Sequence, residues 1–426
     1  MTQQSTHLKV SQMAETMIGS EIIRIAWDIN SKIKAGEKIY NLTIGDYNPS
    51  IFPIPIELKS EIIAAYQNNE TNYPPADGIL SLREEVSKFV FERTKLNYNV
   101  NEILIAGGSR PLIFGVYNVL IEPGEKILFP VPSWNNNHYT HLLRAEAISV
   151  ETGAENNFMP TADELRPYIT EASLLALCSP LNPTGTCISE SSLKEICELV
   201  LAENEKRKSQ GRKPLYMLYD HIYWLLSFKG NVHADPVSLI PAMQEYTVYI
   251  HGISKVFAAT GVRVGWAYGP EHIISRMKSY LGHVGAWAPK AEQIATANFL
   301  RNKDAVNNFL IDINKEINIR LKTFYEGFAT LKREGLPIDV IAPQAAIYLT
   351  VKIDIIGKKT MNGHLINSVK DITQYILDDA KVAIVPFYAF GSSEDSTWFR
   401  LSIGTCQISD IDPIIEAIRM SLIKLQ

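Results

Sequence analysis

Cysteine is scarce in this chain. Only four of its 426 residues are cysteines: Cys178, Cys187, Cys197 and Cys406. Their spacing matches no metal-ligand pattern, and four thiols spread over so long a chain do not make a disulfide framework. The sequence therefore predicts reduced thiols in the core or at the surface, and no metal site.

Long apolar runs and an excess of charge of one sign are missing as well. No apolar run approaches the roughly 20 residues that a transmembrane helix needs. The net charge of −5 disfavours a general binder of nucleic acid or of anionic membranes. The first residues, Met1 to His7, lack the basic and apolar regions of a secretory signal. We therefore expect a cytoplasmic protein that binds neither nucleic acid nor membrane.

The chain does contain the apolar material for a large core, with 46% hydrophobic residues, and its 426 residues predict two domains. Seven short apolar runs predict strands: Glu102–Ala106, Lys126–Pro130, Ala145–Val150, Leu174–Ser179, Leu215–Asp220, Thr247–His251 and Val264–Tyr268. Helical stretches lie between most of them, for example Pro111–Ile121, Ser191–Lys208 and Pro270–Leu281. This alternation predicts an α/β fold with a mostly parallel seven-stranded sheet between helices, and a ligand at the carboxyl ends of its strands.

The pattern changes after about residue 302. The periodic, charged stretch Lys303–Arg333 predicts a connecting helix. Shorter strands follow it (Ile347–Ile353, Val382–Val385 and Trp398–Ile403), with two helices (Gly363–Ala380 and Asp410–Leu425). We therefore expect a large ligand-binding domain over residues 49–302 and a small α+β domain over residues 303–426. Residues 1–48 would form an N-terminal segment that joins the small domain.

Lys255 stands at the end of a predicted strand, among small and polar residues, and Arg263 follows eight residues later. A lysine in such a place is well positioned to act as a nucleophile, and the arginine can hold an anion. A Schiff-base lysine and a phosphate site are what a pyridoxal phosphate enzyme needs. Taken alone, a lysine is far more often a solvated surface charge.

Gly107, Gly108 and Ser109 follow a predicted strand and open the predicted helix Pro111–Ile121. Ser109 suits the N-cap position. Glycines let the backbone approach an anion, and a helix N-terminus offers free N–H groups and positive potential. The segment is either a phosphate cradle or an ordinary glycine turn capped by serine.

Two further segments could contact a flat ring. Pro180 and Pro183 fix a rigid turn around Asn182, whose amide could donate to a ring oxygen. Trp134 follows a strand and could stack on a ring. In isolation, a proline-rich surface turn and a tryptophan packed in the core are the commoner interpretations.

Two charged residues lie in strands. Asp220 ends an apolar strand, where a carboxylate is costly unless it is paired, and a pyridinium nitrogen is a suitable partner. Tyr223, three residues on, could bond the ring hydroxyl. Arg400 lies inside an alternating strand, and its guanidinium fits a carboxylate. The alternatives are an aspartate that caps the next segment and an arginine on the surface of an edge strand.

Together these segments resemble the class I/II aminotransferases of pyridoxal phosphate fold type I, over most of the chain from Tyr40 to Gly404. The motifs that carry the resemblance occur in the family's order. They are Asn182-Pro183-Thr184-Gly185, Tyr219-Asp220-His221-Ile222-Tyr223, Ser254-Lys255 with Thr260-Gly261-Val262-Arg263-Val264-Gly265, and Phe399-Arg400-Leu401-Ser402.

The resemblance implies pyridoxal 5'-phosphate as the cofactor, bound in the large domain. Lys255 would form the internal aldimine and shuttle the proton, and Asp220 would pair with the pyridine nitrogen. Asn182 and Tyr223 would bond the ring oxygen, and Trp134 would stack on the ring.

The resemblance also implies where the anions bind. Gly108, Ser109 and Arg263 would hold the phosphate, and Arg400 would clamp the substrate α-carboxylate, with Asn182 beside it. Tyr73 matches a tyrosine that reaches the phosphate of the partner subunit, so a homodimer with shared active sites is expected.

The chain also departs from the family's pattern. Gly45 matches the loop on the substrate side. Gly252, in contrast, stands where the family often has serine or threonine, and His221 stands where an acidic residue is common. Bacterial aspartate enzymes often carry a lysine at the position of Ser109, so the amino donor stays open, with Arg110 as another cation nearby.

Three functions follow from these residues. The first is transamination between an L-amino acid and a 2-oxo acid. The alternatives are a C–S lyase or other β-eliminating enzyme on the same scaffold, and a non-catalytic relative that acts as a binding or regulatory module.

Overall fold

The computed structural model describes residues 10–17, 19, 21–228, 231 and 233–426. Its centre is a seven-stranded sheet with the strand order β2-β8-β7-β6-β5-β3-β4. The strands are β2 Ile103–Ala106, β3 Lys126–Val131, β4 Glu146–Glu151, β5 Ala172–Cys178, β6 Tyr216–Asp220, β7 Thr247–Gly252 and β8 Gly265–Tyr268. Strand β8 runs antiparallel to its two neighbours, and the other pairs are parallel. The predicted α/β fold with a mostly parallel sheet is confirmed.

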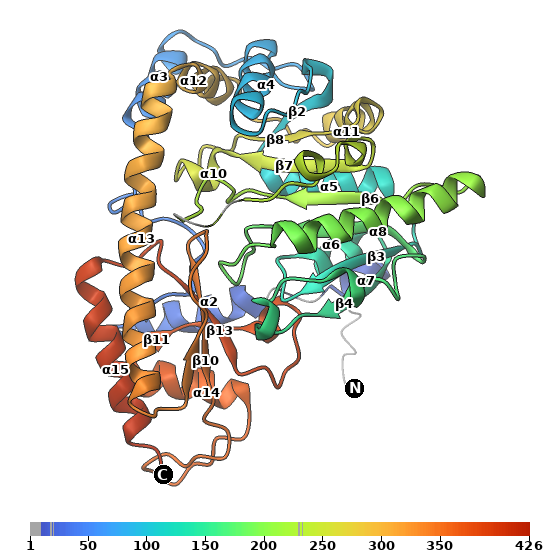
Figure 1. Ribbon diagram of the computed structural model, residues 1–426. Coiled ribbons are helices and arrows are strands. Elements are labelled where there is room, and N and C mark those ends of the chain that lie inside the picture. The colour runs from blue at the N-terminus through green and yellow to red at the C-terminus, as the bar shows by residue number, and fades with distance from the viewer. Residues whose placement is uncertain (1–9, 18, 20, 229–230, 232) are drawn as a thin grey trace, which may run out of the picture.

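Helices cover both faces of this sheet (Figure 1). Side chains alternate along the strands, so that Ile103 and Ile105 of β2 join one core while Leu104 and Ala106 join the other. The first core includes side chains of α4 Leu80–Thr94, α7 Ala162–Leu165, α8 Glu190–Ser209 and α9 Pro236–Leu239. The second includes side chains of α5 Ser109–Leu120, α6 Asn136–Leu142 and α11 Glu271–His283. Two more helices, α3 Ile56–Gln67 and α12 Lys290–Arg301, pack together beside α4.

Helix α5 begins earlier than the sequence predicted, at Ser109, and its N-cap is Gly108. The prediction that Ser109 is the N-cap was therefore wrong by one residue. Gly108 has φ +98° and ψ −179°, a conformation that side chains disfavour and glycine adopts freely. Glycine at this position lets the chain turn directly from β2 into the helix.

The long helix α13 spans Lys303–Arg333, as predicted, and packs against α12 and against strands of a second sheet (Figure 1). The second sheet is antiparallel, in the order β12-β13-β10-β9. Its strands are β9 Ile338–Val340, β10 Tyr348–Ile353, β12 Val385–Pro386 and β13 Trp398–Ser402, and the C-terminal helices are α14 Val369–Tyr375 and α15 Ile411–Ile423.

Two expected elements in this region differ from the structure. The helix expected from Gly363 begins at Val369, because the Ser368 hydroxyl caps it by accepting the N–H of Asp371. The strand expected over residues 382–385 is two strands, since β11 (Val382–Ala383) and β12 pair with different neighbours.

The N-terminal segment packs against this C-terminal region. Strand β1 (Tyr40–Asn41) pairs in parallel with β11. After the short helix α1 (Gln12–Glu15), helix α2 (Glu21–Lys34) places Ile25 and Ile29 against Leu377 and Ala383. The division into residues 1–48, 49–302 and 303–426, with the first segment joining the small domain, stays a prediction.

Candidate active site

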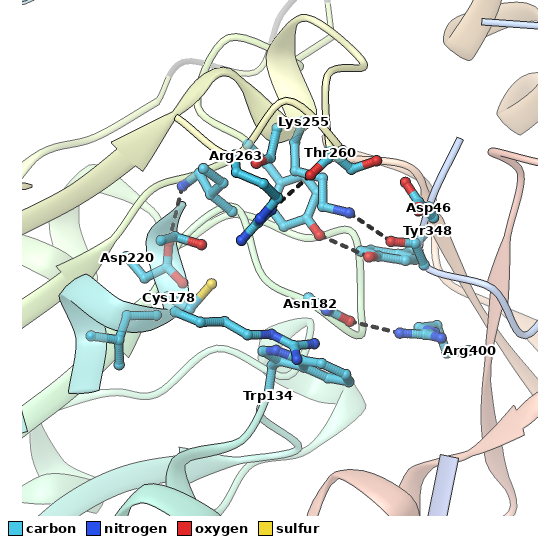
Figure 2. Close-up of a pocket in the computed structure, with 18 residues that line it drawn as sticks. Asp46, Trp134, Cys178, Asn182, Asp220, Lys255, Thr260, Arg263, Tyr348 and Arg400 are labelled. Carbon is cyan, nitrogen blue, oxygen red and sulfur yellow. Dashed lines mark hydrogen bonds between the residues drawn. The ribbon is translucent and has the colours of Figure 1, made fainter. Parts of the chain in front are cut away.

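A pocket of about 500 Å³ lies at the carboxyl ends of the parallel strands. Residues that follow β2, β3, β5, β6 and β7 meet here, because parallel strands end at one edge of a sheet. Arg400 on β13 and Tyr348 on β10 lie on the opposite side (Figure 2). Gly45 also lines the pocket. Nine of the predicted residues line the pocket: Gly45, Ser109, Trp134, Asn182, Asp220, Tyr223, Lys255, Arg263 and Arg400.

Lys255 lies on α10 (Ile253–Val256), which follows β7 without a loop. Its Nζ donates a hydrogen bond of 2.6 Å to the carbonyl oxygen of Gly45. Burial lowers the pKa of the Lys255 amine from 10.5 to about 8, and the nearby carboxylate of Asp46 opposes this shift. An amine with a pKa close to neutral can both take up and release a proton under physiological conditions.

Asp220 is the last residue of β6, and its carboxylate faces the pocket. One carboxylate oxygen accepts the backbone N–H of Ile222 at 3.1 Å. No lysine, arginine or histidine among the described residues forms an ion pair with it. Burial raises the pKa of Asp220 to about 6. The side chain is therefore placed to pair with a cationic or N–H group of a bound ligand.

Arg263 and the start of α5 form one polar corner of the pocket. The guanidinium of Arg263 donates to the carbonyl oxygens of Thr260 at 2.7 Å and Gly107 at 2.8 Å. Gly108 does not line the pocket but lies beneath this guanidinium, since a Cβ at Gly108 would stand 2.2 Å from Nη2 of Arg263. Ser109 brings the N-terminus of the helix to the same corner. A fixed guanidinium beside free helical N–H groups suits an anion such as a phosphate.

Arg400 is 1% exposed and is held from several sides. It donates to the Asn182 Oδ1 at 3.0 Å and to the carbonyl oxygen of Thr43 at 2.5 Å. Its guanidinium carbon also lies 4.8 Å from the ring centre of Tyr348 and 4.9 Å from that of Phe390. Its Nε has no hydrogen-bond partner in the described part of the chain. Such an arginine is fixed in orientation and keeps a donor for a ligand carboxylate.

Asn182 and Trp134 complete the walls. Because arginine only donates, the bond from Arg400 fixes the Asn182 amide with its oxygen toward the arginine, which leaves the NH₂ group free to donate. Trp134 lines the pocket with Arg110, whose guanidinium carbon lies 5.5 Å from the centre of the tryptophan ring. In the described structure the Arg110 guanidinium has no carboxylate partner.

The pocket therefore carries four cationic side chains and two carboxylates. The cations are Arg110, Lys255, Arg263 and Arg400, and the carboxylates are Asp46 and Asp220. This excess of cationic side chains suits bound molecules that carry several negative charges.

Residues 37–418 match the family model described as "Aminotransferase class I and II". The match covers most of the chain. The protein belongs to the class I and II aminotransferases.

Curated relatives agree with this assignment. A bifunctional aspartate aminotransferase and glutamate/aspartate-prephenate aminotransferase of Petunia hybrida is 27% identical over 423 residues, 98% of this chain and 84% of the relative. The aspartate aminotransferase of Rhizobium meliloti strain 1021 is 26% identical over 392 residues, 91% of this chain and 90% of the relative.

Solved structures agree as well. The crystal structure of the aspartate aminotransferase from Rhizobium meliloti superposes with a TM-score of 0.89 at 25% identity, over 98% of this chain and 100% of that one. The Thermus thermophilus aspartate aminotransferase with maleate gives a TM-score of 0.84 at 24% identity, over 97% of this chain and 100% of that one, and supports the fold.

Family membership defines the chemistry. Class I and II aminotransferases use pyridoxal phosphate to move an amino group between an amino acid and a 2-oxo acid, so this chain is a transaminase. The comparisons favour this reaction over the C–S lyase and over the non-catalytic module. The pocket fits the cofactor, because it offers a fixed guanidinium at Arg263, an aromatic wall at Trp134 and a carboxylate at Asp220 that has no cationic partner in the described structure. Among the described residues, no helix is both long and apolar enough to cross a membrane.

Tyr73 does not line this aminotransferase pocket but lines a separate hollow. It is 81% exposed, and its ring packs edge-on against Trp287, with 5.2 Å between the two ring centres. This hollow contains both rings, together with Lys290. Its predicted contact with a partner subunit stays a prediction.

Tyr348 and Asp46 are among the pocket residues that sequence reasoning missed. Tyr348 pairs with Ser402 across β10 and β13, which places it on the same face of the sheet as Arg400, two residues away. Finding it required the register of these two strands, which the sequence alone does not give. Asp46 directly follows Gly45, and that proximity was the available signal.

The two departures from the family pattern have structural explanations. Gly252 pairs with Gly265 so closely that a Cβ at Gly252 would stand 2.7 Å from the Cα of Gly265. A side chain there would push β7 and β8 apart. His221 is 1% exposed and points into the core, where its Nε2 lies 3.0 Å from the Tyr268 hydroxyl and its Nδ1 lies 3.4 Å from Nε2 of His233. It therefore belongs to a packed aromatic cluster.

Proposed function

We propose that this aminotransferase carries pyridoxal phosphate on Lys255 and exchanges amino groups in two half-reactions. The observation that supports this most strongly is the convergence of Lys255, Asp220 and two fixed arginines on one pocket of about 500 Å³. When bound, the cofactor supplies an electron sink that stabilises negative charge at the substrate Cα. The remaining steps belong to side chains of the protein.

Asp220 and Trp134 would hold the cofactor ring. The Asp220 carboxylate, which lacks a cationic partner among the residues described, would accept the ring N–H and keep that nitrogen protonated. Burial strengthens such a pairing, because charges interact more strongly away from water. Trp134 would stack on the ring, with Arg110 moving from its present position over the tryptophan.

The ring oxygen would accept hydrogen bonds from the free NH₂ group of Asn182 and from the hydroxyl of Tyr223. At the other end of the ligand, Arg263, Gly108 and Ser109 would hold the phosphate. The two carbonyl bonds of Arg263 fix its guanidinium before the ligand arrives, so little side-chain entropy is lost on binding.

Lys255 would move the proton between the substrate Cα and the cofactor. Burial brings its amine pKa to about 8, so a useful fraction is unprotonated near neutral pH and can accept that proton. The Gly45 carbonyl, 2.6 Å from Nζ, would keep the released amine inside the pocket.

Arg400 would clamp the α-carboxylate of the substrate, with Asn182 fixing its orientation. The amino donor that we propose is an acidic amino acid, as the names of the relatives suggest. Ser109 carries no positive charge, so it cannot form an ion pair with a side-chain carboxylate as a lysine would. Arg110 offers a guanidinium in the same pocket that pairs with no carboxylate of the described residues, and it would take that role.

We further propose a homodimer in which Tyr73 contacts the cofactor phosphate of the partner subunit. Its support is the sequence motif together with 81% exposure of an aromatic side chain. The test mixes two inactive variants, Tyr73→Ala and Lys255→Ala, by co-refolding. Shared sites restore activity in heterodimers, which contain one intact site. Absence of recovery despite demonstrated subunit exchange would show that Tyr73 serves its own chain.

A single-turnover experiment tests the reaction itself. Cofactor-loaded protein is mixed with one amino acid and no 2-oxo acid acceptor. Transamination yields one 2-oxo acid per site, retains the nitrogen on the protein and then stops. Continued release of ammonia would instead show elimination and would overturn the proposal.

A further inference from the structure

Two buried tyrosine hydroxyls meet at the floor of the pocket. The Tyr223 and Tyr348 oxygens lie 2.7 Å apart, which is the length of a good hydrogen bond. Figure 2 draws it as the dashed line that ends at the labelled Tyr348. Tyr223 follows β6 of the large sheet, and Tyr348 opens β10 of the small sheet. The side chains are 3% and 0% exposed, so competition from bulk water is small. This bond links the two sheets inside the pocket.

Tyr348 also touches the residues around it. The guanidinium carbon of Arg400 lies 4.8 Å from the centre of its ring. Its hydroxyl lies against the backbone of Gly45, since a Cβ at Gly45 would stand 2.8 Å from that oxygen. Gly45 in turn accepts the hydrogen bond of Lys255. The ring and the hydroxyl of Tyr348 therefore have separate contacts, and they can be tested separately.

The direction of the hydrogen bond between Tyr223 and Tyr348 follows from the number of protons on the two hydroxyls. Burial raises the pKa of both hydroxyls above the ordinary value of 10, so each carries one proton at neutral pH. If Tyr223 donates its proton to the ring oxygen of the cofactor, it has none left for Tyr348. The 2.7 Å contact then requires Tyr348 to be the donor and Tyr223 the acceptor.

We propose that Tyr348 is a positioning residue that acts through Tyr223. By donating to Tyr223, it turns the Tyr223 O–H toward the cofactor ring and strengthens that donation, because hydrogen bonds in a chain polarise one another. The role rests on the proposed function, in which Tyr223 contacts the ring oxygen. Tyr348 itself does not need to touch the cofactor.

The test uses Tyr348→Phe, Tyr223→Phe and the double variant, each loaded with pyridoxal phosphate. Phenylalanine keeps the ring under Arg400 and removes only the hydroxyl. The readout is the apparent pKa of the bound cofactor, taken from its absorbance as pH is varied. Losing a donor to the ring oxygen destabilises the oxygen anion, so both single variants should raise this pKa. We expect about 0.5–1 unit for Tyr348→Phe and a larger shift for Tyr223→Phe.

The double variant gives the sharpest outcome. If Tyr348 acts through Tyr223, the double variant titrates like Tyr223→Phe alone. The KM for an amino acid should change less than about 2-fold in Tyr348→Phe, because the ring under Arg400 remains. The matched control is Tyr375→Phe, which removes a hydroxyl that donates 2.7 Å to the Ser421 carbonyl away from the pocket. This control should leave the titration unchanged.

Two results would overturn the role of Tyr348. One is an unshifted pKa in a folded, cofactor-loaded Tyr348→Phe protein. The other is a double variant in which the two shifts add. A wild-type protein that takes up no cofactor would overturn the proposed function itself, and with it this role, so the two failures are distinguishable.

Discussion

Replacing Arg400 with lysine tests the carboxylate clamp without removing the positive charge. The structure holds the guanidinium with two hydrogen bonds and two aromatic rings, and leaves Nε without a partner in the described residues. Lysine offers one compact ammonium and loses the planar fork. One hydrogen bond between charged groups contributes about 1.5–3 kcal/mol, so we expect kcat/KM to fall roughly 10- to 150-fold.

The assay compares Arg400→Lys with wild type over a panel of acidic and neutral amino acids. Every α-amino acid presents the same carboxylate, so KM should rise for all substrates by a similar factor while their rank order stays. Arg419→Lys is the control, since Arg419 pairs with Glu334 on the outer surface. A loss confined to acidic substrates would refute the reasoning and would place Arg400 in the side-chain pocket.

Three further changes have distinct expected outcomes. Asp220→Ala should lower kcat on the order of 100-fold or more while cofactor affinity, measured by titration, changes far less; near-normal kcat with weak cofactor binding would contradict this. Arg110→Gln should reduce kcat/KM at least about 10-fold for acidic amino acids and spare neutral ones, and a uniform loss would argue against a side-chain role. Burial lowers the pKa of His251 to about 3, so the unfolded state, with a pKa near 6.5, binds the extra proton as pH falls below 6.5. The free energy of unfolding, measured with urea at pH 7.5 and 5.5, should therefore fall by about 1.4 kcal/mol less in His251→Gln than in wild type. In the exposed control His283→Gln it should fall by as much as in wild type.

The strands of the large sheet were predictable because each is a short, nearly continuous apolar run between polar turns. All seven, and the long helix Lys303–Arg333, lie where the sequence pattern places them, within a residue or two at most ends. The elements that differ are decided by local hydrogen bonds. Ser368 delays the start of α14, and the partners of β11 and β12 split one apolar run into two strands.

The site was predictable where motifs follow strand ends, since parallel strands bring those ends together. Lys255, Asp220 and Asn182 are residues of this kind. Tyr348 was not predictable, because its place beside Arg400 depends on the register between β10 and β13. The position of Gly108 beneath the guanidinium of Arg263 likewise follows from a positive φ and a contact between distant segments. Patterns along one segment do not contain such information.

Chemical trapping of the cofactor tests the central claim most directly. Protein loaded with pyridoxal phosphate is reduced with borohydride, digested and mapped by mass spectrometry. We predict that the phosphopyridoxyl group is found on Lys255, and that Lys255→Ala loses it while the exposed control Lys322→Ala keeps it. A label on a different lysine, or none on a protein that has bound the cofactor, would contradict the account.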